Sequence, residues 1–100
     1  MNKLYMQRTI DNLYRLIIPR EIVGQLATKN INYQVDFCNS LIITVNENGN
    51  KKIDNFNRVA IPHPMARRLG LNPRDLVNMD FYEDKIVIWR VEWCVKSVKD

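Results

Sequence analysis

The chain carries the same short motif twice, and this repeat limits what it can fold into more than any other feature. The first copy runs from Ile10 to Pro19 and the second from Ile53 to Pro62. Both copies begin with Ile-Asp-Asn, place an arginine four residues after the aspartate, and close an apolar run with Ile-Pro. A repeated motif indicates that one structural unit occurs twice, so each element predicted in one half should have a counterpart in the other.

The two units are too small to fold separately. The chain has 100 residues, 46% of them hydrophobic, which is enough material for one globular domain. A unit of roughly 45 residues rarely buries enough surface to be stable by itself. We therefore predict a single domain over residues 1–100, in which repeat 1 (about 3–45) and repeat 2 (about 51–95) share one core and residues 46–50 link them.

The basic charge of the chain is mild and is spread over both repeats. The formal net charge is +4, from five basic and three acidic side chains in residues 1–45 and ten and eight in residues 46–100. Such an excess favours an acidic partner such as nucleic acid. Because both halves contribute to it, the excess does not come from a disordered basic tail.

Several classes of site and location are not indicated. Cys38 and Cys94 lack the spacing of a zinc site and are too few for a disulfide scaffold, so we expect free thiols in a reducing cytoplasm. His63 has no cluster of carboxylates or cysteines beside it that would make a metal site, and it is expected on the surface.

Neither a signal-peptide core nor a stretch of about 18 apolar residues is present, so we expect no membrane contact. Without a phosphate loop or a catalytic set, we predict no enzymatic activity, metal or cofactor.

The first repeat is predicted to contain two strands, a short helix and two further strands. Apolar residues at even positions predict a strand within residues 1–10, and a turn at Asp11 separates it from a strand over residues 16–18. Helical spacing of apolar residues predicts a helix within residues 20–28. Alternation over residues 33–37 and an apolar run over residues 41–45 predict two strands around a turn at Asn39 and Ser40.

The second repeat is predicted to follow the same order. The polar segment 46–50 carries an Asn-Gly turn signal and precedes a turn at residues 54–57 and a strand over residues 58–61. Pro64 suits the start of a helix and Gly70 its end. Residues 77–81 alternate as a strand, an acidic turn follows at residues 83–84, and a strand follows over residues 85–91.

The last strand is predicted to continue beyond the length of its counterpart in repeat 1. The alternation continues as far as residue 95 and presents valine and tryptophan on one face, including Trp89 and Trp93. Two interpretations remain open. The strand is either an edge strand packed on its own core or a surface for a protein partner.

The order and spacing of these motifs resemble the AbrB/SpoVT/MazE superfamily of bacterial swapped-hairpin DNA-binding domains. The resemblance covers residues 8–45 and 51–91, and repeat 2 is the closer match. It implies a mainly β fold with two short helices, in which tandem β-β-α-β-β repeats form a swapped-hairpin β-barrel pseudo-dimer. Two copies in one chain are similar to the arrangement in MraZ, and further assembly into a homo-oligomer is compatible with the resemblance.

The resemblance also implies that arginines near the turns and helices contact DNA. Guanidinium groups bind phosphate oxygens in pairs and can reach guanine edges. For Arg15 and Arg58 the alternative is an ion pair with Asp11 and Asp54 that orients each turn, and the two roles can coexist. For the pair on the second helix, the alternative is a solvated helix face. The predicted DNA-binding residues are Arg8, Arg15, Lys51, Lys52, Arg58, Arg67 and Arg68.

The two repeats are unequal on their helices. Arg67 and Arg68 occupy places where repeat 1 has Gly24 and Gln25, so a symmetric DNA footprint is not expected. The resulting hypothesis is a bacterial, nucleoid-associated transcriptional regulator that binds double-stranded DNA. The alternative is an antitoxin-like or scaffold module of the same fold that binds protein.

Overall fold

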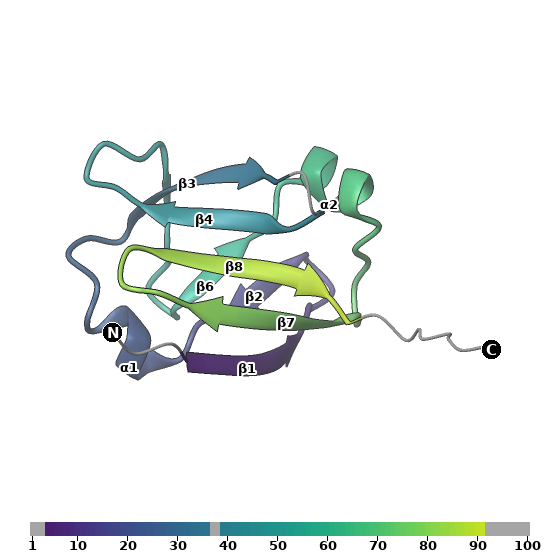
Figure 1. The fold of residues 1–100 in the computed structure, drawn as a ribbon, viewed down its shortest axis with the longest axis horizontal. Coiled ribbons are helices and arrows are strands. Elements are labelled where there is room, and N and C mark those ends of the chain that lie inside the picture. The colour runs from purple at the N-terminus through teal and green to yellow at the C-terminus, as the bar shows by residue number, and fades with distance from the viewer. Residues whose placement is uncertain (1–3, 37–38, 92–100) are drawn as a thin grey trace.

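The computed structural model describes residues 4–36 and 39–91 (Figure 1). Repeat 1 contains β1 (Leu4–Thr9), β2 (Arg15–Ile17), α1 (Arg20–Val23), β3 (Asn30–Val35) and β4 (Leu41–Val45). Repeat 2 contains β5 (Lys51–Lys52), β6 (Arg58–Ala60), α2 (His63–Leu69), β7 (Leu76–Phe81) and β8 (Lys85–Arg90). The predicted order of elements, mainly β with two short helices, is therefore confirmed in both repeats. The predicted extension through residue 95, with Trp93, lies outside the described residues, as do Cys38 and Cys94.

The described strands form two antiparallel sheets whose pairing crosses between the repeats. One sheet has six strands in the order β1-β7-β8-β4-β3-β5, and the other pairs β2 with β6. The hairpins β3–β4 and β7–β8 lie within one repeat, but β1 pairs with β7 and β5 pairs with β3. Exchanging the two repeats leaves this strand order unchanged. The strand pairing therefore has an approximate two-fold symmetry.

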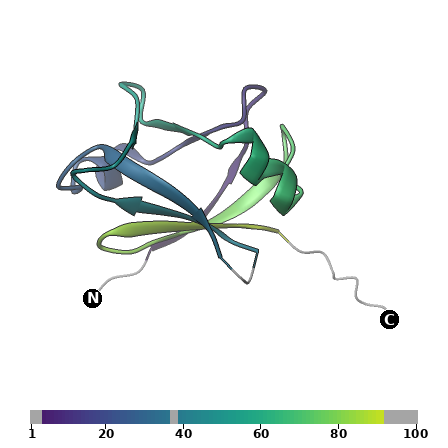
Figure 2. The same cartoon turned by 90° about the horizontal axis from the view of Figure 1, so that it is seen from above.

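The two sheets enclose a core to which both repeats contribute. Figure 2 shows the six-stranded sheet on one side, the β2–β6 ladder on the other, and the helices α1 and α2 at opposite ends. Leu16 and Val59 of the ladder are fully buried, as are Ile43 and Ile88 of the large sheet. Burial of these apolar side chains is the main favourable term in folding, and neither repeat could provide both layers alone.

A closed barrel is not established by the pairing of the described strands. β1 and β5 are the edges of the six-stranded sheet, and the β2–β6 ladder forms a separate sheet. A barrel requires a hydrogen-bonded circuit through all its strands. The observed arrangement is an open antiparallel sheet covered by a two-stranded ladder. The closed swapped-hairpin barrel that the resemblance implies is not seen in this pairing of the described strands.

The first helix is shorter than predicted, whereas the second agrees with the prediction. Instead of extending towards residue 28, α1 ends at Val23. The N–H groups of Gln25 and Leu26 bond to carbonyls only three residues back, at 3.0 Å and 3.1 Å. Gly24 follows the helix, where a glycine disfavours continuation. By contrast, α2 ends at Gly70, whose φ of 70° is the left-handed conformation that favours glycine.

The segment predicted as a linker is packed against the sheet. The Gly49 N–H donates to Asn46 O at 2.8 Å, and the Asn50 N–H donates to the side chain of Asn32 on β3 at 3.2 Å. A Cβ added at Gly49 would lie only 2.5 Å from the backbone nitrogen of Ile31. Residues 46–50 therefore form a tight turn in which a glycine is needed for close approach to β3.

Candidate nucleic-acid interface

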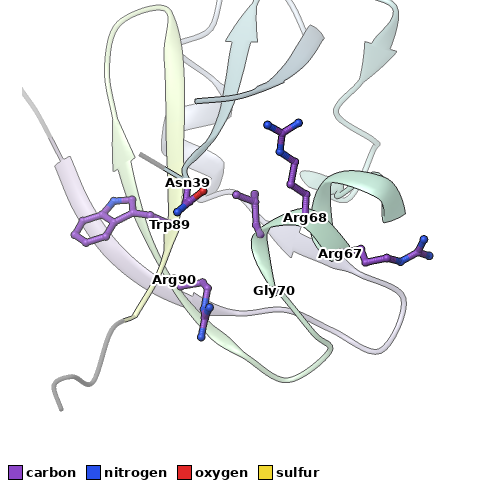
Figure 3. A pocket seen from close by; sticks show the side chains of 7 residues that line it. Asn39, Arg67, Arg68, Gly70, Trp89 and Arg90 are labelled. Atoms are coloured by element: carbon purple, nitrogen blue, oxygen red, sulfur yellow. The ribbon is translucent and has the colours of Figure 1, made fainter. Parts of the chain in front are cut away.

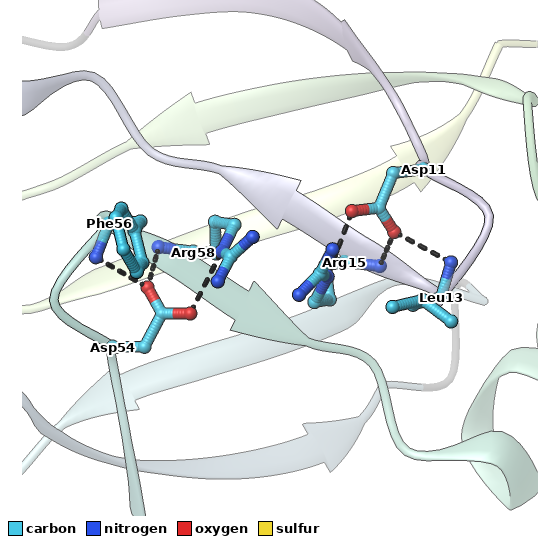
Figure 4. A network of polar contacts seen from close by, with 6 residues as sticks. All are labelled: Asp11, Leu13, Arg15, Asp54, Phe56 and Arg58. Carbon is cyan, nitrogen blue, oxygen red and sulfur yellow. Dashed lines mark hydrogen bonds and ion pairs between the residues drawn. The ribbon is translucent and has the colours of Figure 1, made fainter.

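The first copy of the repeated motif forms a turn held by one carboxylate. One oxygen of Asp11 accepts hydrogen bonds from the N–H groups of Leu13 (2.9 Å) and Arg15 (2.8 Å). The other oxygen pairs with Nε of Arg15 at 2.9 Å. Figure 4 shows these contacts. Aspartate suits this position because its short side chain can accept hydrogen bonds from backbone N–H groups two to four residues further along the chain.

The second copy repeats this bonding pattern almost bond for bond. Asp54 accepts from the N–H groups of Phe56 (2.8 Å) and Arg58 (2.9 Å), and its other oxygen pairs with Nε of Arg58 at 2.9 Å (Figure 4). The ion pair considered from the sequence is thus present in both copies. Because only Nε of each arginine is used, the two terminal nitrogens of each guanidinium have no hydrogen-bond partner among the described residues.

Each turn is fastened to the opposite repeat. Tyr14 and Asn57 end the two turns with positive φ angles of 60° and 64°, which is uncommon for residues other than glycine. The carbonyl of Tyr14 accepts from the N–H of Ile61 at 2.8 Å, and that of Asn57 accepts from the N–H of Ile18 at 2.7 Å. These bonds extend the β2–β6 ladder to both turns, so the turns are held in place relative to each other.

The β2–β6 ladder places the two arginines on one outward face. Leu16 lies opposite Val59, and both are fully buried, so the residues on either side of them point away from the core. Arg15 lies opposite Ala60, two residues beyond Arg58 on the same strand. Diagonal neighbours in an antiparallel pair are about 7–8 Å apart. We call the outward side of this ladder, with the turns at residues 11–14 and 54–57, the ladder face.

The electrostatics of the two turns favour charged side chains. For both Asp11 and Asp54, desolvation alone would raise the pKa, but hydrogen bonds from backbone N–H groups and from the paired arginine outweigh it. The pKa of each carboxyl is therefore below its ordinary value of 3.8. At neutral pH each turn contains a carboxylate and a guanidinium, and the side chains of Arg15 and Arg58 remain 29% and 26% exposed.

The other predicted cations near the motif lie on the edge strands of the six-stranded sheet. Arg8 is exposed on β1, and Lys51 and Lys52 are exposed on β5. β1 and β5 are opposite edges of the six-stranded sheet. The pairing therefore brings Arg15 and Arg58 together, but it places Arg8 and the two lysines on separate edge strands. Their contact with DNA stays a prediction.

The helix arginines lie beside a cation that sequence reasoning did not select. Arg67 and Arg68 are exposed on α2 and line a cavity of about 360 Å³ together with Arg90 of β8. Figure 3 shows the three side chains pointing in different directions around this cavity, which Asn39 and Trp89 also line. Arg90 interrupts the apolar pattern of its strand, but no sequence signal connected it with α2.

The sequence reasoning also missed three apolar residues on the ladder face. Leu13, Ile17 and Phe56 are 65%, 56% and 70% exposed. Leu13 and Phe56 occupy the same position in the two copies of the motif, and this equivalence was the signal that could have identified them. His63 is exposed, as expected, and its ring lies 4.7 Å from that of Tyr14 at the end of the first turn.

Comparison with known proteins found no match to a protein family, to a curated protein or to a solved structure. Among residues 4–36 and 39–91, no group of His, Cys, Asp or Glu side chains has the arrangement of a metal site. In the same residues, neither helix has the length and apolar character needed to cross a membrane.

Proposed function

We propose that the protein is a DNA-binding transcriptional regulator of the AbrB/SpoVT type, which contacts duplex DNA through Arg15 and Arg58. The observation that carries this proposal is the duplicated turn, in which an aspartate holds an arginine by Nε and leaves its outer nitrogens for another anion. Phosphate contacts from such guanidinium groups would give binding that depends little on sequence.

The exchange of strands between repeats supports the same proposal. In the AbrB-type architecture, two units interleave around an approximate two-fold axis, and here β1 pairs with β7 while β5 pairs with β3. We infer that the chain is a covalently linked pseudo-dimer of this kind. Two-fold placement of the arginines suits duplex DNA, whose two strands are themselves related by local two-fold symmetry.

The test is a titration of duplex DNA at several salt concentrations. Each phosphate contact contributes roughly 0.9 to the slope of log K against log salt. The variant Arg15→Gln/Arg58→Gln should bind more weakly, and its slope should be lower by roughly 1.8 if each arginine neutralises one phosphate. Lys85→Gln is the matched control for the single variant Arg58→Gln, because each removes one positive charge and Lys85 lies on β8 of the large sheet, where it stacks on Tyr82.

Two results would reject the proposal. The first is the absence of wild-type binding to duplex DNA at low salt. The second is an equal loss of affinity in Lys85→Gln and in Arg58→Gln, which each remove one positive charge, since a general charge effect would then explain the binding.

A second candidate function is favoured by exposed apolar residues on the outer face of the six-stranded sheet. Tyr5, Leu76 and Trp89 are all exposed, and the strand register places them on the same side of β1, β7 and β8. Such a patch suits a protein partner or self-association. Sedimentation velocity would test it, since a chain that stays monomeric at high concentration and is unaffected by Trp89→Ser would exclude self-association.

A further inference from the structure

Leu13 and Phe56 stand out as large apolar side chains with no role in the core. They occupy equivalent turns, and they are 65% and 70% exposed. Neither is among the buried core residues or the partly buried residues packed against the core. A single exposed apolar residue needs no explanation, but the same feature at the tip of both copies indicates a contact with something outside the chain.

The structure fixes the backbone that carries these two side chains. The N–H groups of Leu13 and Phe56 each donate to the carboxylate that also pairs with the arginine of the same turn. Each turn is then bonded to the opposite repeat at its left-handed residue, Tyr14 or Asn57. Because the backbone of each turn is already ordered, binding has to order only the side chain.

Charge and apolar surface alternate across the ladder face. The guanidinium of Arg58 lies 4.8 Å from the centre of the Phe56 ring, and Ile17, which is 56% exposed, lies on the strand between the two turns. Asp11 and Asp54 are already engaged by Arg15 and Arg58. The ladder face therefore offers two cations with unpaired donors, flanked by two apolar tips.

We propose that Leu13 and Phe56 enter a groove of duplex DNA on either side of the two arginines, an inference that rests on the proposed function. Arginines that contact phosphates position a protein on the duplex. Apolar side chains at the same interface contact thymine methyl groups or wedge between base steps. The apolar tips would thus supply the part of the affinity that does not depend on salt.

This arrangement favours duplex DNA over the other possible occupants. A second protein would need a larger continuous apolar surface than two separate tips and Ile17 provide. An anionic membrane also attracts mixed basic and apolar surfaces, but usually through a continuous amphipathic helix. Two apolar tips on equivalent, hydrogen-bonded turns instead match a target that presents equivalent sites on its two strands.

The test compares polar and apolar substitutions at the tips. Leu13→Ser/Phe56→Ser should weaken binding by at least roughly tenfold, because two apolar side chains lose their buried contact. The salt slope should stay at the wild-type value, since no phosphate contact is removed. Tyr5→Ser/Leu76→Ser is the matched control, because these two exposed apolar residues lie on the outer face of the six-stranded sheet and not on the ladder face, and it should retain wild-type affinity.

A conservative variant separates a groove contact from an indirect effect on Arg58. Phe56→Leu keeps an apolar tip but removes the ring over which Arg58 lies, and repeat 1 already carries leucine at this position. Phe56→Leu should therefore bind DNA within about threefold of wild type. An equal loss in Phe56→Leu and Phe56→Ser would overturn the groove contact, because the ring would then act only by holding Arg58.

Failure of this inference can be distinguished from failure of the proposed function. If the wild type binds DNA with a salt slope that Arg58→Gln lowers, but the serine variants bind equally well, only the groove contact is rejected. If the wild type binds vesicles containing anionic lipid and not DNA, both are rejected. Thermal melting of each variant shows whether it is folded, and exposed tips should alter the melting temperature little.

Discussion

At the scale of single residues, one aspartate in each turn has three structural partners. Asp11 fixes the backbone at two N–H groups and holds the side chain of Arg15. Asparagine could accept the backbone bonds, but it has no charge to attract the guanidinium. One carboxylate therefore both fixes the turn and orients the arginine. Asp54 does the same in the second repeat.

The two aspartates should make the protein more stable at neutral pH than in acid. Their pKa values are lowered in the folded state from the ordinary 3.8, so this contribution is fully present well above pH 4 and is lost as the pH falls through the folded-state pKa values. Asp11→Asn/Asp54→Asn should lower the melting temperature at pH 7, and the difference from wild type should shrink towards pH 2. Melting curves between pH 2 and pH 7 test this, and a difference independent of pH would contradict it.

At the scale of elements, the two helices show how similar segments diverge. α2 has seven residues and a left-handed glycine at its end, whereas α1 has four residues and is followed by Gly24 in a right-handed conformation. Arg67 and Arg68 of α2 correspond to Gly24 and Gln25 in repeat 1, and the basic residue of α1, Arg20, lies at the position of His63. The ladder is nearly symmetric, so any asymmetry in a bound DNA should arise where the helices flank it.

The turn at residues 46–50 makes a prediction about glycine. Gly49→Ala should reduce the free energy of unfolding by about 1–3 kcal/mol, because the added Cβ would meet the backbone of Ile31 at 2.5–2.7 Å. Gly24→Ala is the matched control. Its Cβ would meet the nearest atom at an ordinary 3.4 Å, so its stability should be equal to wild type or higher by less than about 1 kcal/mol.

Urea denaturation of the two variants provides the measurement. If Gly49→Ala and Gly24→Ala have the same stability, the close packing of the turn against β3 does not contribute to folding. If Gly24→Ala is the more damaging substitution, the end of α1 is more constrained than its φ of −65° indicates.

At the scale of the whole molecule, strand pairing joins the two repeats. β1 pairs with β7, β4 with β8, β5 with β3 and β2 with β6. Without the other repeat, each repeat would keep only the strand pairing of its own hairpin, β3–β4 or β7–β8. An isolated hairpin is marginal in water, and its apolar face would be exposed.

The two repeats should therefore fold only together. Residues 1–47 and residues 48–100, produced as separate chains, should each lack a cooperative unfolding transition. When they are mixed, a cooperative transition should return with a midpoint that depends on concentration, because association is now bimolecular. Circular dichroism during heating tests this, and cooperative melting of either fragment alone would show that a repeat is a self-sufficient unit.

The residue pattern alone predicted most of the local structure. Element order, both turns, the extent of β4 and the end of α2 at Gly70 follow from preferences that act between residues two to four positions apart. The positions of Asp11, Arg15, Asp54 and Arg58 were readable for the same reason. The extent of α1 was not, because the residues after Val23 have helical spacing but are held in tight turns.

What only the tertiary structure decided depends on contacts between residues far apart in the chain. A strand pattern states which side chains share a face but not which strand lies beside it, so the pairing of β1 with β7 could not be derived from periodicity. The same pairing separated Arg8 from Lys51 and Lys52, brought Arg15 beside Arg58, and left Leu13 and Phe56 exposed. The sequence thus determined the two Asp–Arg turns, and the strand exchange decided that they form one face, because only long-range pairing sets distances between the repeats.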